Sequence, residues 1–120
     1  MEKILNLTQH PASKEQKESG VFEPEDKERV KEILTFSEIP AKLMLEIKAI
    51  SLMMIAKREG ATTVMIGGAP FFMSALESAL INEDIHVLYA FSKRESIETT
   101  LPSGEVVKKS MFKHVGFVEV

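Results

Sequence analysis

Residues 62–72, "TTVMIGGAPFF", contain the transition that decides the fold. "TTVMI" is a short run of β-branched and apolar residues, which is typical of a buried strand. "GGAP" then forms a tight turn, and Pro70 suits the first position of a helix that we expect over residues 71–82. A strand that passes through a tight turn into a helix is the repeating unit of α/β folds.

On the N-terminal side we expect another buried strand and a series of helices. Residues 3–8 form an apolar run that stops at "TQHP", where Pro11 prevents the strand from continuing. The predicted helices are a short one that a capping box over residues 13–16 begins and Gly20 ends, one from Pro24 to about Leu34, and one from Pro40 to Arg58 with Gly60 as its C-terminal cap.

On the C-terminal side, "HVLYAF" at residues 86–91 predicts a third strand, and the β-rich runs on either side of "PSG" at 102–104 predict a β-hairpin. Strand, helices, strand, helix, strand is the order of an α/β fold, and right-handed crossovers make the three strands parallel. We therefore expect a single domain over residues 1–120, with a parallel sheet flanked by helices and a C-terminal β-hairpin.

The composition excludes several classes of function. With 15 basic and 18 acidic residues the net charge is -3, so the broad positive field that long nucleic acids require is absent. The sequence has no cysteine, which excludes disulfides and thiolate metal sites. It shows no signal peptide and no run of about 20 apolar residues. We expect a cytoplasmic protein that does not bind membranes.

Three chemically distinctive segments follow the three predicted strands: "TQHP" at 8–11, "GGAPF" at 67–71 and "SKRES" at 92–96. The carboxyl ends of parallel strands lie at one edge of a sheet, where ligands commonly bind. The sequence therefore predicts one site built from these three segments.

In the first segment His10 is the candidate catalytic residue, because imidazole titrates near neutral pH and can transfer a proton. Thr8 and Gln9 are candidates for orienting a substrate. The alternative is that Thr8 and Gln9 only satisfy backbone groups around the turn at Pro11.

The other two segments are candidates for ligand binding. Gly67, Gly68 and Ala69 precede a helix N-terminus, where backbone N–H groups can hold an anion, although glycine pairs often only form the turn. "GGAP" matches neither the phosphate-binding loop nor the dinucleotide signature. In "SKRES" the cations Lys93 and Arg94 could bind phosphate. Ser92 and Ser96 could donate hydroxyl hydrogen bonds; alternatively, the segment is a solvated loop.

We expect no metal and no cofactor, since the three histidines are widely separated and form no zinc motif. His86 begins a strand and has a structural interpretation. His114 either packs on the body of the protein or reaches the site of a partner.

The predicted helix over residues 40–58 has apolar residues on more than one side. Either it is a fully internal core helix, or another helix or a second subunit covers its second side. We expect a homodimer on this basis.

The strand that ends in "LTQHP", the small-residue and proline turn after the central strand, and the compact α/β body resemble the small CRISPR-associated ring nucleases and their phage-borne relatives. That family is similar to the CARF ligand-binding domains, which are dimeric and Rossmann-like. The resemblance covers about the first two thirds of the chain, and only "LTQHP" is at all specific to it; the C-terminal hairpin departs from the simplest members.

The resemblance implies that the protein binds a cyclic oligoadenylate, and cyclic tetra-adenylate in particular, at a dimer interface. It implies metal-independent cleavage in which a ribose 2′-hydroxyl attacks the adjacent phosphate, an activity that switches off type III CRISPR signalling in antiviral defence. Two alternatives remain: a nucleotide-binding sponge or sensor that does not cut its ligand, and a small phage or accessory module that binds another protein.

Overall fold

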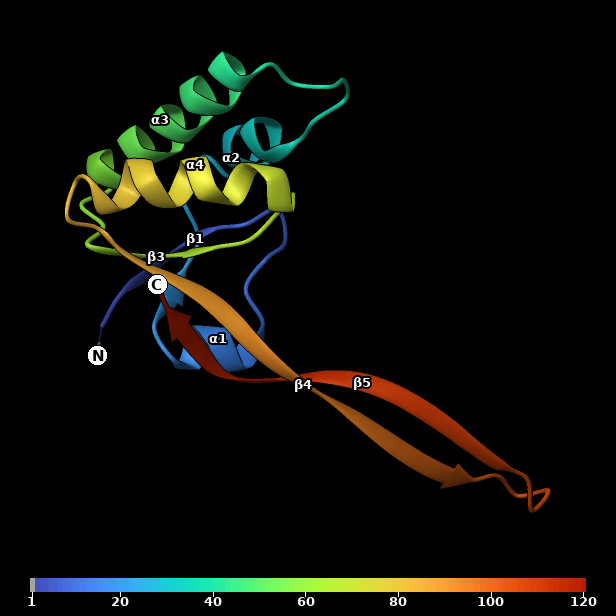
Figure 1. The fold of residues 1–120 in the computed structure, drawn as a ribbon. Coiled ribbons are helices and arrows are strands. Elements are labelled where there is room, and N and C mark those ends of the chain that lie inside the picture. The colour runs from blue at the N-terminus through green and yellow to red at the C-terminus, as the bar shows by residue number, and fades with distance from the viewer. Residues whose placement is uncertain (1) are drawn as a thin grey trace.

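The computed structural model describes residues 2–120 as a mixed α/β protein with one five-stranded sheet (Figure 1). The strands lie in the order β2-β1-β3-β4-β5. The elements are β1 (Ile4–Leu7), α1 (Lys14–Glu18), β2 (Val21–Phe22), α2 (Lys27–Leu34), α3 (Lys42–Arg58), β3 (Thr63–Ile66), α4 (Pro70–Ile81), β4 (His86–Thr100) and β5 (Val106–Glu119).

The sheet is mostly parallel. β1 pairs in parallel with both β2 and β3, and β3 pairs in parallel with β4, whereas β5 runs antiparallel to β4. The three expected strands and their parallel direction are thus confirmed. β2 was not expected, because a strand of two residues is too short to show any periodicity.

The local signals for helix ends place most helices correctly. Ser13 and Gln16 form the expected capping box at the start of α1. Pro70 is at the beginning of α4. α2 begins later than expected, at Lys27, because Asp26 acts as its N-cap and accepts a hydrogen bond from the Arg29 N–H.

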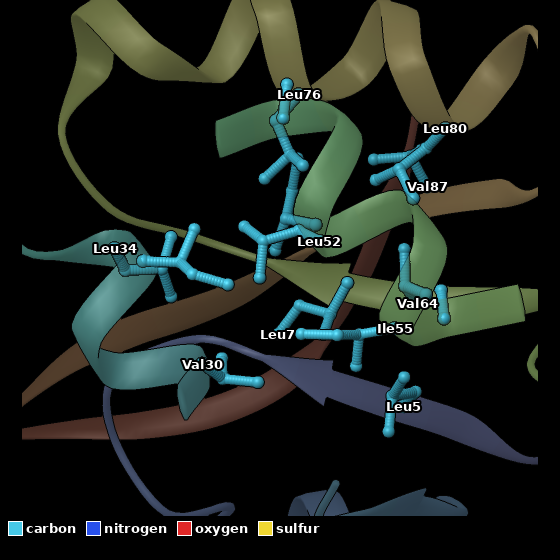
Figure 2. Packing of buried hydrophobic residues seen from close by; sticks show 14 of the residues in the cluster. Leu5, Leu7, Val30, Leu34, Leu52, Ile55, Val64, Leu76, Leu80 and Val87 are labelled. Carbon is cyan, nitrogen blue, oxygen red and sulfur yellow. The ribbon is translucent and has the colours of Figure 1, made fainter. Parts of the chain in front are cut away.

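The main core lies between the sheet and the layer of α2, α3 and α4 (Figures 1 and 2). Alternate residues of each strand, such as Leu5 and Leu7 of β1, point into this core. The opposite face of the sheet is covered in part by the segment around α1 and holds a smaller cluster. Its members are Ile4, Ala12, Val21, Met65 and Leu88, with Phe117 packed against them.

α3 buries only one side. Ala49, Leu52, Ile55 and Ala56 are its buried residues. Five apolar residues of the same helix are exposed: Leu43, Met44, Ile47, Ile50 and Met54. The interpretation of α3 as an internal core helix is therefore wrong for this chain, because α2 and α4 leave its outer side open.

The expectation that residues 92–96 form a loop is also wrong. They lie within β4, where Ser92 pairs with His114 and Ser96 pairs with Ser110 of β5. Their polar composition suggests a loop, yet backbone hydrogen bonds to β5 hold them extended. A strand with both faces exposed needs no alternation of apolar and polar residues, so the sequence gives no signal that residues 92–96 form a strand.

Beyond the parallel part of the sheet, β4 and β5 continue as a protruding two-stranded arm, defined here as residues 92–115 (Figure 1). A register shift between Phe91 and Ser92 marks its base. The radius of gyration is 17.2 Å, against about 14 Å for a compact chain of this length. The longest dimension of the molecule is 57 Å, and the arm accounts for this elongation.

Within residues 2–120, no helix has both the length and the apolar character that crossing a membrane requires.

Candidate functional site

Two of the three predicted segments meet at the carboxyl edge of the sheet. Residues 8–11, which follow β1, and Gly67 and Gly68, which follow β3, line the same pocket of about 470 Å³. Tyr89 and Ala90 of β4 form a further part of its wall, and Ser13 and Gln16 of α1 complete it. The sequence-based prediction of a shared edge for the first two segments is confirmed.

Asn6 holds the segment after β1 in place. It is fully buried in the middle of an otherwise apolar strand. Its Oδ1 accepts hydrogen bonds from the Thr8 N–H at 3.0 Å and from the Thr8 hydroxyl at 2.7 Å. Its Nδ2 donates to the His10 carbonyl at 2.9 Å and to the Glu23 carboxylate at 3.0 Å. One amide side chain thus fixes the turn from both sides.

Glu23 and Lys27 extend this network. The Glu23 carboxylate accepts from the Ala12 N–H at 2.6 Å and pairs with Lys27 at 3.1 Å. Lys27 also donates to the carbonyls of Thr8, at 2.7 Å, and His10, at 3.1 Å. Burial by itself raises the pKa of Glu23, but hydrogen bonds from Ala12, Lys27 and Asn6 outweigh it and hold that pKa below its usual value.

These contacts separate the roles of the three predicted catalytic residues. The Thr8 hydroxyl is engaged with Asn6, so Thr8 is a structural member of the turn. Gln9 donates from Nε2 to the Thr35 hydroxyl at 3.0 Å, which ties the segment to the end of α2. His10 is exposed at the pocket. Of the three side chains, the His10 imidazole is the one best placed to meet a ligand.

Gly67 and Gly68 make the second wall. A β-carbon at Gly67 would lie 3.5 Å from Thr8 Cγ2, which shows how closely the two segments approach. Gly68 has φ +155°, a conformation that favours glycine. Ala69 is the N-cap residue of α4 and lies beside the pocket without lining it. The turn therefore presents backbone, not side chains, to the pocket.

The third predicted segment lies elsewhere. Among the described residues that line the pocket there is no lysine or arginine. Ser92 instead lines an adjacent hollow of about 360 Å³ between α1 and the arm, together with Lys113 and His114. Arg94 and Ser96 are exposed on the arm. β4 carries all of these residues past the edge where β1 and β3 end.

Ser13 and Gln16 line both the pocket and the adjacent hollow, so α1 is the wall between them. His114 lines the adjacent hollow and not the pocket. Its ring stacks edge-to-face on Phe117 at 4.9 Å, and within residues 2–120 neither of its buried ring nitrogens has a hydrogen-bond partner. Within this chain His114 thus packs on Phe117 at the base of the arm.

Sequence reasoning missed Asn6, Glu23, Lys27 and the pair formed by Tyr89 and Glu77. The Tyr89 hydroxyl donates to Glu77 of α4, and burial together with this carboxylate raises the pKa of Tyr89, so its phenol stays protonated. A signal for Asn6 was present, because an amide at the centre of "ILNL" is unusual for a buried strand. The partners from other elements had no such signal.

His86 begins β4, as expected, and its Nδ1 lies 3.0 Å from a carboxylate oxygen of Glu119 at the protein surface. In the part of the chain that the structure describes, no group of three or more His, Asp or Glu side chains is arranged to hold a metal ion.

The fold and the pocket define a class: a small α/β protein with a pocket where parallel strands end. Over residues 2–118 the chain matches the family described as "Uncharacterized protein MJ1673 family", and it belongs to that family. A search of curated proteins gave no match. A search of solved structures likewise gave none.

Proposed function

We propose that the protein is a ring nuclease that binds and cleaves cyclic oligoadenylate, and so ends the signal of type III CRISPR defence. The observation that carries the proposal is the pocket at the carboxyl edge, which exposed His10 lines together with Gly67 and Gly68. An imidazole beside a helix N-terminus suits the transfer of a proton close to an anionic phosphate.

The fold proposed with this function is Rossmann-like and related to CARF domains. Four parallel strands in the order β2-β1-β3-β4, with the change of strand order beside β1, support it. In this proposal the antiparallel β4 and β5 form the C-terminal β-hairpin that the sequence predicts.

The proposed reaction needs no metal ion. The ribose 2′-oxygen attacks the neighbouring phosphorus while the bond from phosphorus to the 5′-oxygen breaks. The products are a 2′,3′-cyclic phosphate and a 5′-hydroxyl, and the proton of the 2′-hydroxyl is balanced by the one that the leaving oxygen receives. His10 carries a proton or, when charged, stabilises the developing anion. The backbone N–H groups of Gly67 and Gly68, which line the pocket, bind phosphate oxygens.

The test is incubation of the protein with cyclic oligoadenylates of several ring sizes in the presence of chelator, followed by separation of the products. We expect linear products with 2′,3′-cyclic phosphate ends. His10→Ala should slow turnover by roughly 100-fold or more with little change in melting temperature, because His10 is exposed. Equal rates for His10→Ala and the parent protein would remove His10 from the mechanism.

A second candidate function is a sponge that binds the same ligand without cutting it. Two observations favour it: the Thr8 hydroxyl is already engaged by Asn6, and the described lining of the pocket holds no cation to stabilise a pentacovalent phosphorus. A sponge would form a complex from which the intact cyclic ligand is recovered after long incubation.

A further inference from the structure

The arm exposes many apolar side chains to solvent. Phe112 is 76% exposed, and Met111 is 50% exposed beside it. Other exposed apolar residues of the arm are Ile97, Leu101, Val106, Val107 and Val115. Scattered apolar residues on a surface are ordinary, but a concentration of them on one protruding element marks an interaction surface.

The strand pairing within the arm also indicates an interaction surface. From Ser92 to Thr100 the strand β4 has only β5 as its neighbour, since its pairing with β3 ends at Tyr89. A two-stranded ribbon by itself is at best marginally stable in water. Its outer edges also expose unpaired backbone groups that favour contact with another chain. Apart from the side of its base that shares a hollow with α1, the faces and edges of the arm are thus available to a partner.

The charge of the arm favours a second copy of this chain as the partner. Residues 92–115 contain five basic and three acidic residues, a net charge of +2, so the rest of this chain with its total of -3 carries -5. The arm and the body therefore have opposite charge, which favours contact between the arm of one copy and the body of another. The arm also supplies 24 residues, which is within the about 20 to 30 per side of a typical interface.

We propose that the arm clasps the body of a second copy of this chain in a two-fold dimer. The arm leaves the body at the carboxyl edge of the sheet (Figure 1). Two copies whose carboxyl edges face each other can each extend the arm along the other body, and the contact is reciprocal. The two pockets then face each other across the interface.

This arrangement gives Lys93 and Arg94 a role at the pocket of the partner, a step that rests on the proposed function. Both residues are at the base of the arm, next to the interface, while the pocket of their own chain has no cation in its described lining. The site of each copy is thus completed in trans by the phosphate-binding cations of the other.

The assembly can be tested without any nucleotide. Light scattering on the full chain should give a dimer mass at micromolar concentration. Chains labelled with ¹⁵N are mixed with unlabelled chains and treated with a short lysine-reactive cross-linker. Lys108 and Lys109, near the tip of the arm, should cross-link to lysines of the body in peptide pairs that combine the two labels. A monomer mass, or cross-links confined to one label, overturns the proposal.

Matched variants locate the contact. Replacing Met111 and Phe112 by aspartate should raise the dissociation constant of the dimer about 100-fold or more, as loss of a central apolar contact does. Ile81→Asp is the control, since Ile81 is 46% exposed at the C-terminal end of α4, at the edge of the sheet opposite the arm. If the control variant dissociates the dimer equally, the arm is not the contact. If the protein is a monomer that binds single-stranded RNA through the lysines of the arm, the arm has another function.

The trans role has its own test. His10→Ala chains are mixed with chains carrying Lys93→Ala and Arg94→Ala, after brief unfolding to exchange subunits. Completion in trans regenerates one intact pocket per mixed dimer and restores activity, whereas completion within one chain restores none. Failure of the parent protein to cleave refutes the proposed function and leaves the assembly result unaffected.

Discussion

A single amide, that of Asn6, sets the position of the segment that bears His10. Asn6 is buried within β1 and contacts Thr8, His10 and Glu23 through hydrogen bonds on both sides of its amide group. A buried polar network of this kind is stabilising only while every member has its partners. The turn at the pocket is therefore specified by the strand that precedes it.

We predict that Asn6→Ala lowers the free energy of unfolding by about 2 to 4 kcal/mol, because it leaves the Thr8 N–H without its partner and removes the hydrogen bonds of Asn6 to the Glu23 carboxylate and the His10 carbonyl. Urea unfolding followed by circular dichroism measures this change. Asn82→Ala, at an exposed position after α4, is the control and should have a small effect. Equal losses for the two variants would show that the network contributes nothing specific.

The network also predicts a dependence of stability on pH. The pKa of Glu23 is lowered in the folded protein from its ordinary value of 4.5. The stabilisation it provides is therefore present above that value and is lost as the pH falls through the lowered folded pKa. The stability difference between the parent and Glu23→Gln should be largest near neutral pH and shrink in acid. A difference that stays constant down to about pH 3 would contradict this.

At the scale of elements, the parts that the sequence predicts well are those with a local physical signal. The capping box of α1, the proline that opens α4 and Gly60, at φ +69° after α3, all act through groups within a few residues. β2 and the continuation of β4 depend on pairing with distant strands, which local composition does not encode. The same dependence on distant pairing explains why the site was predicted only in part. The segments after β1 and β3 were placed correctly, but "SKRES" was not, because its pairing with β5 continues the strand past the edge of the sheet.

The arm carries a prediction about charge. Lys93→Ala combined with Arg94→Ala should weaken the binding of cyclic oligoadenylate and reduce the salt dependence of its affinity, because fewer phosphate contacts remain. Isothermal titration at two salt concentrations measures both effects. Lys57→Ala combined with Arg58→Ala removes the same charge in the last turn of α3, at the opposite edge of the sheet, and should leave the salt dependence unchanged. Unchanged affinity in the first variant at low salt excludes these cations from the site.

At the scale of the whole molecule, the protein joins a compact α/β body to an element that cannot bury its own apolar residues. The radius of gyration of 17.2 Å reflects this combination. If dimer formation buries these residues, the free energy of unfolding includes the free energy of dissociation. The stability should then depend on protein concentration.

We predict that the melting temperature rises with protein concentration over the micromolar range, because a dimer is favoured by mass action. Calorimetry at three concentrations measures this dependence. The variant with aspartate at Met111 and Phe112 should melt at one temperature throughout. A melting temperature of the parent that is independent of concentration would indicate a body that is stable without a second copy.

The hydrogen bond between Tyr89 and Glu77 has a spectroscopic consequence. Tyr89 is the single tyrosine of a sequence without tryptophan, and it forms part of the pocket wall. The intrinsic fluorescence of the protein therefore comes from one side chain at the site. We expect its carboxylate partner, Glu77, to quench this emission while the hydrogen bond holds. A molecule that enters the pocket and disturbs this bond should change the emission of the unlabelled protein. Ligand binding can therefore be followed by the intrinsic fluorescence of Tyr89.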